Sequence, residues 1–260
     1  MKTYTKAELI EALVQIRNQG FIRNKRRGNH GGIGNTLEDL LGIEENNLPL
    51  PNAGEWELKT QKLGSNALNT LFHMEPSPRA LQFVREVLLP LYGWPHEKAG
   101  LLYPASEMSF RQTINGLTRS DRGFRVLVNE AQGRVEVSFD AATVDSRHAD
   151  WLTGVAAKVG LGELNPQPYW GLTDLFHKAG TKLSSCFFVQ AEVEMRDSEE
   201  FYFYDRIMML SEFSIDGLVR GLHEGWVLVD FDARTGHNHG TKFRLRQNHY
   251  PQLYKNATIF

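Results

Sequence analysis

The chain has 260 residues, of which 41% are hydrophobic and 23% charged, and its formal net charge is −2. This near-neutral balance excludes a protein that binds polyanions through bulk charge alone, so any contact with nucleic acid must come from local basic clusters. No stretch approaches the apolar length of a membrane span, and the N-terminus lacks an apolar signal core. The single cysteine, Cys186, excludes a disulfide framework and is expected as a buried strand thiol. We therefore expect an intracellular protein.

The first part of the chain predicts two helices, a strand and a third helix. Thr5 and Glu8 form a capping-box pattern ahead of apolar residues at helical spacing, and Gly20 ends this helix. After a glycine-rich turn, Thr36 is expected to cap a short second helix. A strand is expected over residues 55–60 and another helix over residues 78–93.

The rest of the chain predicts antiparallel strands with one short helix. Two alternating runs over residues 124–139 predict a hairpin, and the runs 186–195 and 201–210 predict a second antiparallel pair. A short helix over residues 214–225 is followed by strands over 226–233 and 242–247. This mixed order favours an α/β or α+β fold rather than a regular βαβ array.

The first candidate catalytic site is the tripeptide formed by Glu57, Leu58 and Lys59. Side chains alternate along a strand, so Glu57 and Lys59 point to the same face. The carboxylate and the Leu58 carbonyl are hard oxygen ligands suited to Mg²⁺, and the lysine can orient a water or stabilise phosphorane charge. The alternative without a catalytic role is a Glu–Lys ion pair on a solvent-facing strand.

Two basic clusters could contact DNA. Arg26 and Arg27 precede the glycine-rich turn, where backbone N–H groups at a helix start suit a phosphate; the alternative is a flexible basic loop. His237 and His239 flank Asn238 in a second cluster, with basic residues alternating after it. Two histidines suggest a metal, but their spacing differs from the metalloprotease helix pattern and the sequence nearby offers no evident third ligand. A loop of this composition instead suits base-edge readout in a DNA groove, and the alternative is a polar surface turn.

Several motifs between residues 22 and 246 together resemble one family: RRGNHGGIGNTLEDLLG, ENNLPLPNAGEWELKT, ALNTLFH, RQTING and GHNHGTKFR. The chain resembles the MvaI/BcnI-type restriction endonucleases, a branch of the PD-(D/E)xK nucleases related to the MutH mismatch-repair nickase. The resemblance implies an α/β fold in which helices flank a mixed β-sheet and two lobes surround a DNA cleft. It implies one domain over residues 1–260, with a catalytic lobe over about 1–75 and DNA-recognition elements over about 73–125 and 230–250.

The resemblance also implies roles for individual residues. The active-site positions are Glu38, Asn52, Glu57 and Lys59, and the metal ligands are Asn52, Glu57 and Leu58. His73 matches a histidine that contacts a base, and one of His237 and His239 is expected to be its counterpart. The complete set of expected DNA contacts is Arg26, Arg27, Asn35, His73, Arg111, His237, His239, Lys242 and Arg244.

The activity implied is that of a bacterial cytoplasmic type II restriction endonuclease. It would be a monomer that uses Mg²⁺ to hydrolyse double-stranded DNA at a CC(C/G)GG-like site, nicking one strand and then the other. A companion DNA methyltransferase is expected in the host, without direct contact. The alternatives are a CC(A/T)GG-specific endonuclease, a MutH-like repair nickase and a DNA-binding relative without catalysis.

Asn52 departs from the family pattern, in which a proline is followed by an aspartate that binds the metal. An amide oxygen can ligate a metal but brings no negative charge. One explanation is an engineered inactive variant that binds DNA without cleaving it, which the intact remaining motifs favour. A second explanation is that Glu55, on the same strand face as Glu57, has taken over metal ligation. A naturally inactive DNA-binding relative is a third.

Overall fold

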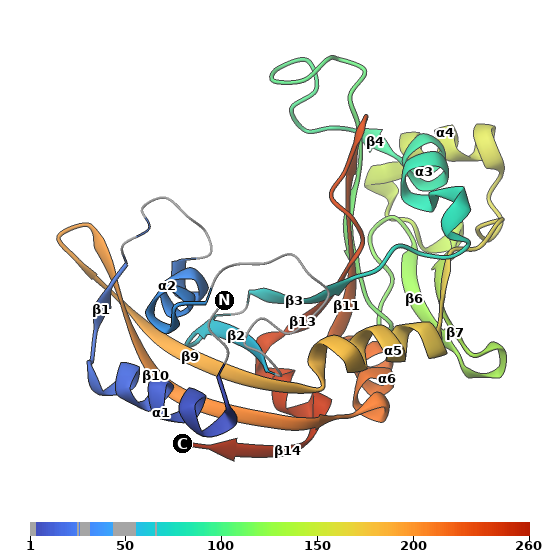
Figure 1. The fold of residues 1–260 in the computed structure, drawn as a ribbon. Coiled ribbons are helices and arrows are strands. Elements are labelled where there is room, and N and C mark those ends of the chain that lie inside the picture. The colour runs from blue at the N-terminus through green and yellow to red at the C-terminus, as the bar shows by residue number, and fades with distance from the viewer. Residues whose placement is uncertain (1–3, 25, 27–31, 44–55, 66) are drawn as a thin grey trace. The chain divides into compact units, whose positions relative to one another are not determined.

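A computed structural model describes the chain apart from residues 1–3, 25, 27–31, 44–55 and 66. The predictions for Arg27, Asn52 and Glu55 therefore lie outside the described residues. The chain divides into two compact units (Figure 1). Unit 1 consists of residues 1–67, 179–215 and 247–260, and unit 2 consists of residues 68–178 and 216–246. None of the described helices is long and apolar enough to cross a membrane.

Unit 1 is built on a mixed sheet of five described strands. A long hairpin joins β9 (Ser185–Arg196) to β10 (Glu199–Phe213) through Asp197 and Ser198, which both have the positive φ of a two-residue hairpin turn. β10 also pairs antiparallel with β1 (Ile22–Arg23) and β14 (Tyr254–Ile259). β2 (Glu57–Lys62) pairs in parallel with β9, so it lies at one end of the strand order.

One face of this sheet is covered by helices α1 (Lys6–Asn18) and α2 (Gly32–Leu41). The α1 cap forms as its sequence predicts: the Thr5 N–H donates to Glu8 at 2.8 Å, and the Glu8 N–H donates to Thr5 Oγ1 at 3.3 Å. Both helices bury leucines against the sheet. The buried core of unit 1 consists of Leu9, Leu13, Ile16, Leu37, Leu41, Ile43, Leu58, Phe187, Val189, Ala191, Tyr202, Tyr204, Ile207 and Met209.

Unit 2 contains two described sheets. The six-stranded sheet has the order β3-β13-β11-β5-β4, and β12 pairs with β11. Its strands are β3 (Leu68–His73), β4 (Trp94–Pro95), β5 (Met108–Ile114), β11 (Val227–Arg234), β12 (His237–Asn238) and β13 (Lys242–Arg246). The three-stranded sheet consists of β6 (Phe124–Asn129), β7 (Arg134–Phe139) and β8 (Tyr169–Gly171).

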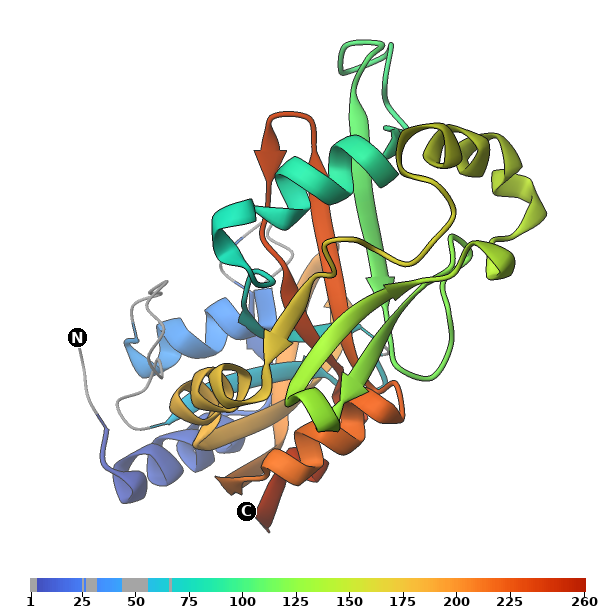
Figure 2. The ribbon, with the colours of Figure 1, turned by 90° about the vertical axis from the view of Figure 1, so that its right-hand side faces the viewer.

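A helical segment made of η2 (Val84–Leu88) and α3 (Leu89–Tyr92) lies across the six-stranded sheet (Figure 2). Phe110 of β5 is fully buried beside the segment, with its ring centroid 5.6 Å from that of Phe124 and 5.5 Å from that of Phe231. The edge-on contact with Phe124 of β6 joins the two sheets of unit 2, and the contact with Phe231 of β11 lies within the six-stranded sheet. The remaining α-helices are α4 (Ala149–Val159), α5 (Leu172–Leu183), inside which the unit boundary falls, and α6 (Ile215–His223).

The other described helical turns are short 3₁₀ segments. They are η1 (Arg79–Leu81), η3 (Glu130–Gln132), η4 (Ala141–Thr143), η5 (Ser146–His148) and η6 (Gln247–Leu253).

The structure confirms the mixed α/β class, the first helix, both predicted hairpins, the helix at α6 and the strands at β11 and β13. The predicted start of α2 is wrong, because the helix begins at Gly32 and buries Thr36 in its interior. A Cβ at position 32 would collide with the Tyr202 hydroxyl, so this glycine permits close packing at the helix start. The helix predicted over residues 78–93 is interrupted at Gln82, whose φ is positive.

Candidate functional site

Strand β2 places the predicted carboxylate and ammonium on the same face. Glu57 and Lys59 stand opposite Cys186 and Phe188 in the parallel register with β9. The Lys59 Nζ lies 2.6 Å from Glu57 Oε1, which confirms that the two side chains point the same way. Leu58 points to the opposite face, into the core shared with α1 and α2.

Glu57 is a buried carboxylate next to two ammonium groups. Its side chain is 3% exposed, and Lys182 Nζ lies 4.0 Å from the same Oε1 atom that Lys59 contacts. Burying a carboxylate without such partners would be strongly unfavourable. Glu57 Oε2 is also buried, and it accepts no hydrogen bond from the described residues. Such an oxygen is suited to a hard divalent cation.

Lys182 is a candidate functional residue that the sequence reasoning missed. It lies in the last turn of α5, where a lysine ordinarily complements the partial negative charge at a helix C-terminus. No motif connects it with Glu57, and only the parallel pairing of β2 with β9 brings the start of β9, just after α5, beside β2. The contact could therefore not be read from spacing.

The groups beneath Glu57 remain uncharged. Burial raises the pKa of the Cys186 thiol to about 12, although the positive charge of Lys59 opposes this effect. Burial likewise raises the pKa of the Tyr250 and Tyr254 hydroxyls well above the ordinary value. Cys186 is thus the buried strand thiol that the sequence predicted.

Helix α2 carries two further predicted residues, Asn35 and Glu38, and both are half-buried. A Cβ at Gly34 would lie 3.1 Å from Thr60 Oγ1, so α2 packs closely on the Leu58 and Thr60 face of β2. Glu57 points to the other face. The geometry of β2 therefore does not by itself bring Glu38 to Glu57, and the proposed role of Glu38 rests on the resemblance.

Arg26, the described member of the first basic cluster, forms an ion pair with Asp39 of α2. Its Nε donates to Asp39 Oδ2 at 2.9 Å. Arg26 is 38% and Asp39 46% exposed at the side chain, so solvent weakens this pair and leaves the guanidinium accessible to a phosphate.

In unit 2, residues 235–241 connect β11 to β13 and include β12; we call them the histidine loop. His237 and His239 are both exposed, and their ring centroids lie 4.3 Å apart in an edge-on arrangement. The His239 N–H donates to the Asp232 carbonyl at 2.9 Å, which holds the loop backbone to β11. Both imidazoles are therefore presented to solvent together.

The structure brings His73 to the histidine loop. His73 pairs with Lys242 across β3 and β13, and a Cβ at Gly240 would lie 3.5 Å from the His73 ring. The two segments are far apart in the sequence but meet where the end of β3 pairs with the start of β13. This arrangement places three exposed imidazoles in one region of unit 2.

The basic residues on the neighbouring strands are paired with aspartates. Asp232 accepts from Arg111 Nε at 2.8 Å and from Lys242 Nζ at 3.2 Å. Burial would raise the pKa of Asp232, but the hydrogen bonds from these two cations outweigh it and lower the pKa below its usual value. Arg244 donates to Asp230 at 3.1 Å and to the Leu68 carbonyl at 2.9 Å.

Of these cations, Arg111 is the most exposed, with 59% of its side chain accessible, compared with 20% for Lys242 and 29% for Arg244. The proposed DNA-contacting role therefore fits Arg111 with the least rearrangement. Arg244 already bonds to both β3 and β11, so its substitution would also disturb β3, which carries His73.

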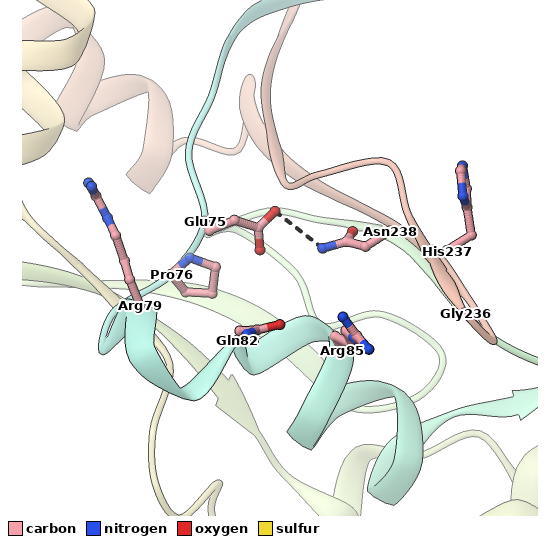
Figure 3. Close-up of a pocket in the computed structure, with 8 residues that line it drawn as sticks. All are labelled: Glu75, Pro76, Arg79, Gln82, Arg85, Gly236, His237 and Asn238. Atoms are coloured by element: carbon pink, nitrogen blue, oxygen red, sulfur yellow. Dashed lines mark hydrogen bonds between the residues drawn. The ribbon is translucent and has the colours of Figure 1, made fainter.

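Two hollows flank Glu75 and Arg79 beside the histidine loop. One, of about 470 Å³, is lined by Glu75, Pro76, Arg79, Gln82, Arg85, Gly236, His237 and Asn238 (Figure 3). The other, of about 700 Å³, is lined by His73, Met74, Glu75, Ser77, Arg79, Asp174, His177 and Lys178. The sequence reasoning had not identified Glu75, Arg79 or Arg85, because single charged residues outside a motif give no local signal.

The mixed α/β fold thus presents a buried carboxylate and a lysine side by side on strand β2. The model of the MvaI/BcnI restriction endonuclease family matches residues 10–254. The chain therefore belongs to the MvaI/BcnI restriction endonuclease family. Membership supports a type II restriction endonuclease, a site-specific deoxyribonuclease.

Two solved structures share the fold. One, described as a complex of restriction endonuclease MvaI with its cognate DNA substrate, has a TM-score of 0.75 and 22% identity, covering 99% of each chain. Restriction endonuclease MvaI in the absence of DNA has a TM-score of 0.55 and 22% identity, covering 100% of this chain and 99% of that one. A comparison with curated protein sequences found no match.

Proposed function

We propose that the chain is a Mg²⁺-dependent endonuclease of the PD-(D/E)xK kind, which hydrolyses phosphodiester bonds in double-stranded DNA. The observation that supports this proposal is the environment of the Glu57 carboxylate. It is a buried carboxylate beside two lysines, and one of its oxygens has no hydrogen-bond donor among the described residues. Unit 1 would be the catalytic lobe, and the histidine loop with His73 would belong to the DNA-recognition lobe.

The residues present fit a divalent cation in part. Glu57 Oε2 and the Leu58 carbonyl are hard oxygen donors, and Asn52 would complete the set. No group of three or more His, Cys, Asp or Glu side chains in the described part of the chain is placed to hold a metal. Mg²⁺, when bound, supplies positive charge at the scissile phosphate and lowers the pKa of a coordinated water.

The chain's own residues would divide the remaining work. Lys59 would stabilise negative charge developing at the phosphate and orient the attacking water. Lys182 would act as a positioning residue that holds Glu57 through Oε1. Glu38 would add a second acidic side chain, and Arg26, Arg27 and Asn35 would contact the DNA backbone. Asn52 makes the chain as given a catalytically impaired variant.

Recognition would rest on the exposed imidazoles of unit 2. A neutral imidazole both donates and accepts, so His73 and one of His237 and His239 can contact C·G and G·C at the centre of a site. We propose CC(C/G)GG as the recognised sequence, with Arg111, Lys242 and Arg244 supporting the contacts. The enzyme would act as a monomer in the bacterial cytoplasm and nick the two strands in turn, and a companion methyltransferase would protect host DNA.

The test is plasmid cleavage in Mg²⁺ by the chain as given and by its Asn52→Asp form. The proposal expects binding without efficient cleavage from the first, and linear product cut at CC(C/G)GG from the second. Nicked product that depends on an accessory protein would favour a repair nickase. Specific binding with no cleavage by either form would favour a non-catalytic relative.

A further inference from the structure

We propose that Glu75 is a positioning residue for sequence recognition, which holds the histidine loop against the strand that carries His73. This inference rests on the proposed function, because it assumes that these imidazoles read the DNA site. Glu75 lies two residues beyond His73, just after β3, and is half-buried.

Both carboxylate oxygens of Glu75 are used by the histidine loop. Oε1 accepts from the Thr241 N–H at 2.7 Å and from Asn238 Nδ2 at 3.5 Å (Figure 3). Oε2 accepts from Thr241 Oγ1 at 3.2 Å. Thr241 is fully buried, so its N–H and hydroxyl need these acceptors. One side chain therefore satisfies donors from two positions of the loop.

The backbone beside Glu75 completes the connection. The Met74 N–H donates to the Thr241 carbonyl at 3.0 Å, and the buried Trp170 Nε1 donates to the Met74 carbonyl at 2.9 Å. Within the loop, the Gly240 N–H donates to Asn238 Oδ1 at 2.9 Å. His73 and the histidine loop thus share one hydrogen-bonded frame.

The loop's own strand pairing is small by comparison. β12 pairs with β11 over two residues, Asn238 with Ala233 and His237 with Arg234. Two further backbone bonds hold the loop: the His239 N–H donates to the Asp232 carbonyl at 2.9 Å, and the Thr235 N–H donates to the Met108 carbonyl at 3.0 Å. The bonds from Asn238 and Thr241 to Glu75 add to these and connect the loop to the segment that follows His73. Removing them should let His237 and His239 move relative to His73.

Glu75 is better placed to position the loop than to read a base. A carboxylate can accept a hydrogen bond from the cytosine amino group, but each oxygen of Glu75 already accepts a hydrogen bond from the loop. Arg79 lines the same hollow, yet Figure 3 shows its guanidinium pointing away from Glu75. The described hydrogen bonds of the Glu75 carboxylate thus all go to Asn238 and Thr241 of the histidine loop.

The experiment measures binding by the chain as given to three duplexes: one with a CC(C/G)GG site, one with a CC(A/T)GG site and one with neither. Glu75→Ala should reduce the affinity ratio between the first two duplexes by about tenfold, the effect of losing a charge-assisted bond. Affinity for the unrelated duplex should change less than about twofold, because phosphate contacts remain. Glu75→Gln keeps one oxygen for the Thr241 N–H and should recover much of the ratio.

Glu86→Ala is the matched control, because Glu86 is a nearby exposed carboxylate that forms an ion pair with Arg85 at 3.1 Å. It should leave the affinity ratio unchanged. If Glu75→Ala does not fold, Thr241→Val removes the hydroxyl bond to Oε2 alone and should lower the ratio by about threefold.

The outcomes separate this inference from the proposed function. If the unchanged chain does not distinguish the duplexes, the proposed recognition site is wrong whatever the variants do. If it does distinguish them and Glu75→Ala keeps the full ratio, Glu75 does not position the loop. Equal losses of affinity for all three duplexes would also overturn the inference, since positioning predicts a loss of discrimination.

Discussion

Strand β2 and the histidine loop assemble their candidate functional residues in opposite ways. On β2, Glu57 and Lys59 are two positions apart, and their charges meet in a largely buried setting. In the histidine loop, His237 and His239 are exposed, and their expected partner His73 comes from a distant segment. Buried charges leave few alternative arrangements, whereas exposed side chains can be exchanged without disturbing a core. Substitutions on the β2 side should therefore stop the reaction, and those at the loop should change what is cut.

The largest expected effect is at position 52. Asn52→Asp should raise the cleavage rate in Mg²⁺ by about a thousandfold, roughly 4 kcal/mol, because a second negative ligand strengthens metal binding where phosphate charge develops. Single-turnover cleavage of a duplex with the site measures this change. Equal rates for the two forms would remove Asn52 from the metal site, and Glu55→Gln in the chain as given would then show whether Glu55 has replaced it.

The next effect concerns Lys59, in the Asn52→Asp background. Lys59→Ala should lower the cleavage rate by about 10²- to 10³-fold, because it removes positive charge at the reacting phosphate. Affinity for the same duplex, measured in Ca²⁺ by fluorescence anisotropy, should change by less than about threefold, because one phosphate contact is a small part of the interface. A large loss of affinity with normal cleavage of the bound DNA would show that Lys59 is a backbone contact.

A smaller effect is expected at Lys182, in the same background. Lys182→Met removes the second ammonium from Glu57 and should lower the cleavage rate by about 10- to 100-fold, as is usual for groups that orient a metal ligand. Lys182→Arg should restore much of the rate, since it restores the charge.

Lys255 provides the matched control for Lys182. It is 68% exposed and forms a similarly long ion pair of 3.9 Å with Glu212, but this pair lies at an exposed strand edge. Lys255→Ala should leave cleavage unchanged. If Lys182→Met matches this control, the contact with Glu57 has no role in the reaction.

The same contrast explains what the sequence could predict. Glu57 and Lys59 were found because a strand's alternation places neighbours two apart on one face, and Thr5 with Glu8 was found because a capping box is local. Lys182 and Glu75 were missed because their contacts arise from pairing between distant strands. The start of α2 was missed for a similar reason: Gly32 has the signature of a turn, and only its packing against Tyr202 explains a glycine there.

The smallest expected effect is on the choice of central base pair, and it tests the loop side of the comparison. His73→Thr, in the Asn52→Asp background, should reduce the preference for a C·G centre over an A·T centre by about tenfold, because one imidazole contact with a base edge is lost. The cleavage rate on the preferred duplex should fall by a smaller factor than the preference, since Glu57 and Lys59 are unchanged.

His237→Ala and His239→Ala, measured the same way, should differ from each other. The variant whose loss of preference matches that of His73→Thr would identify the second base-reading residue. A uniform fall in rate on both duplexes would show that His73 supports β3 and does not read the site.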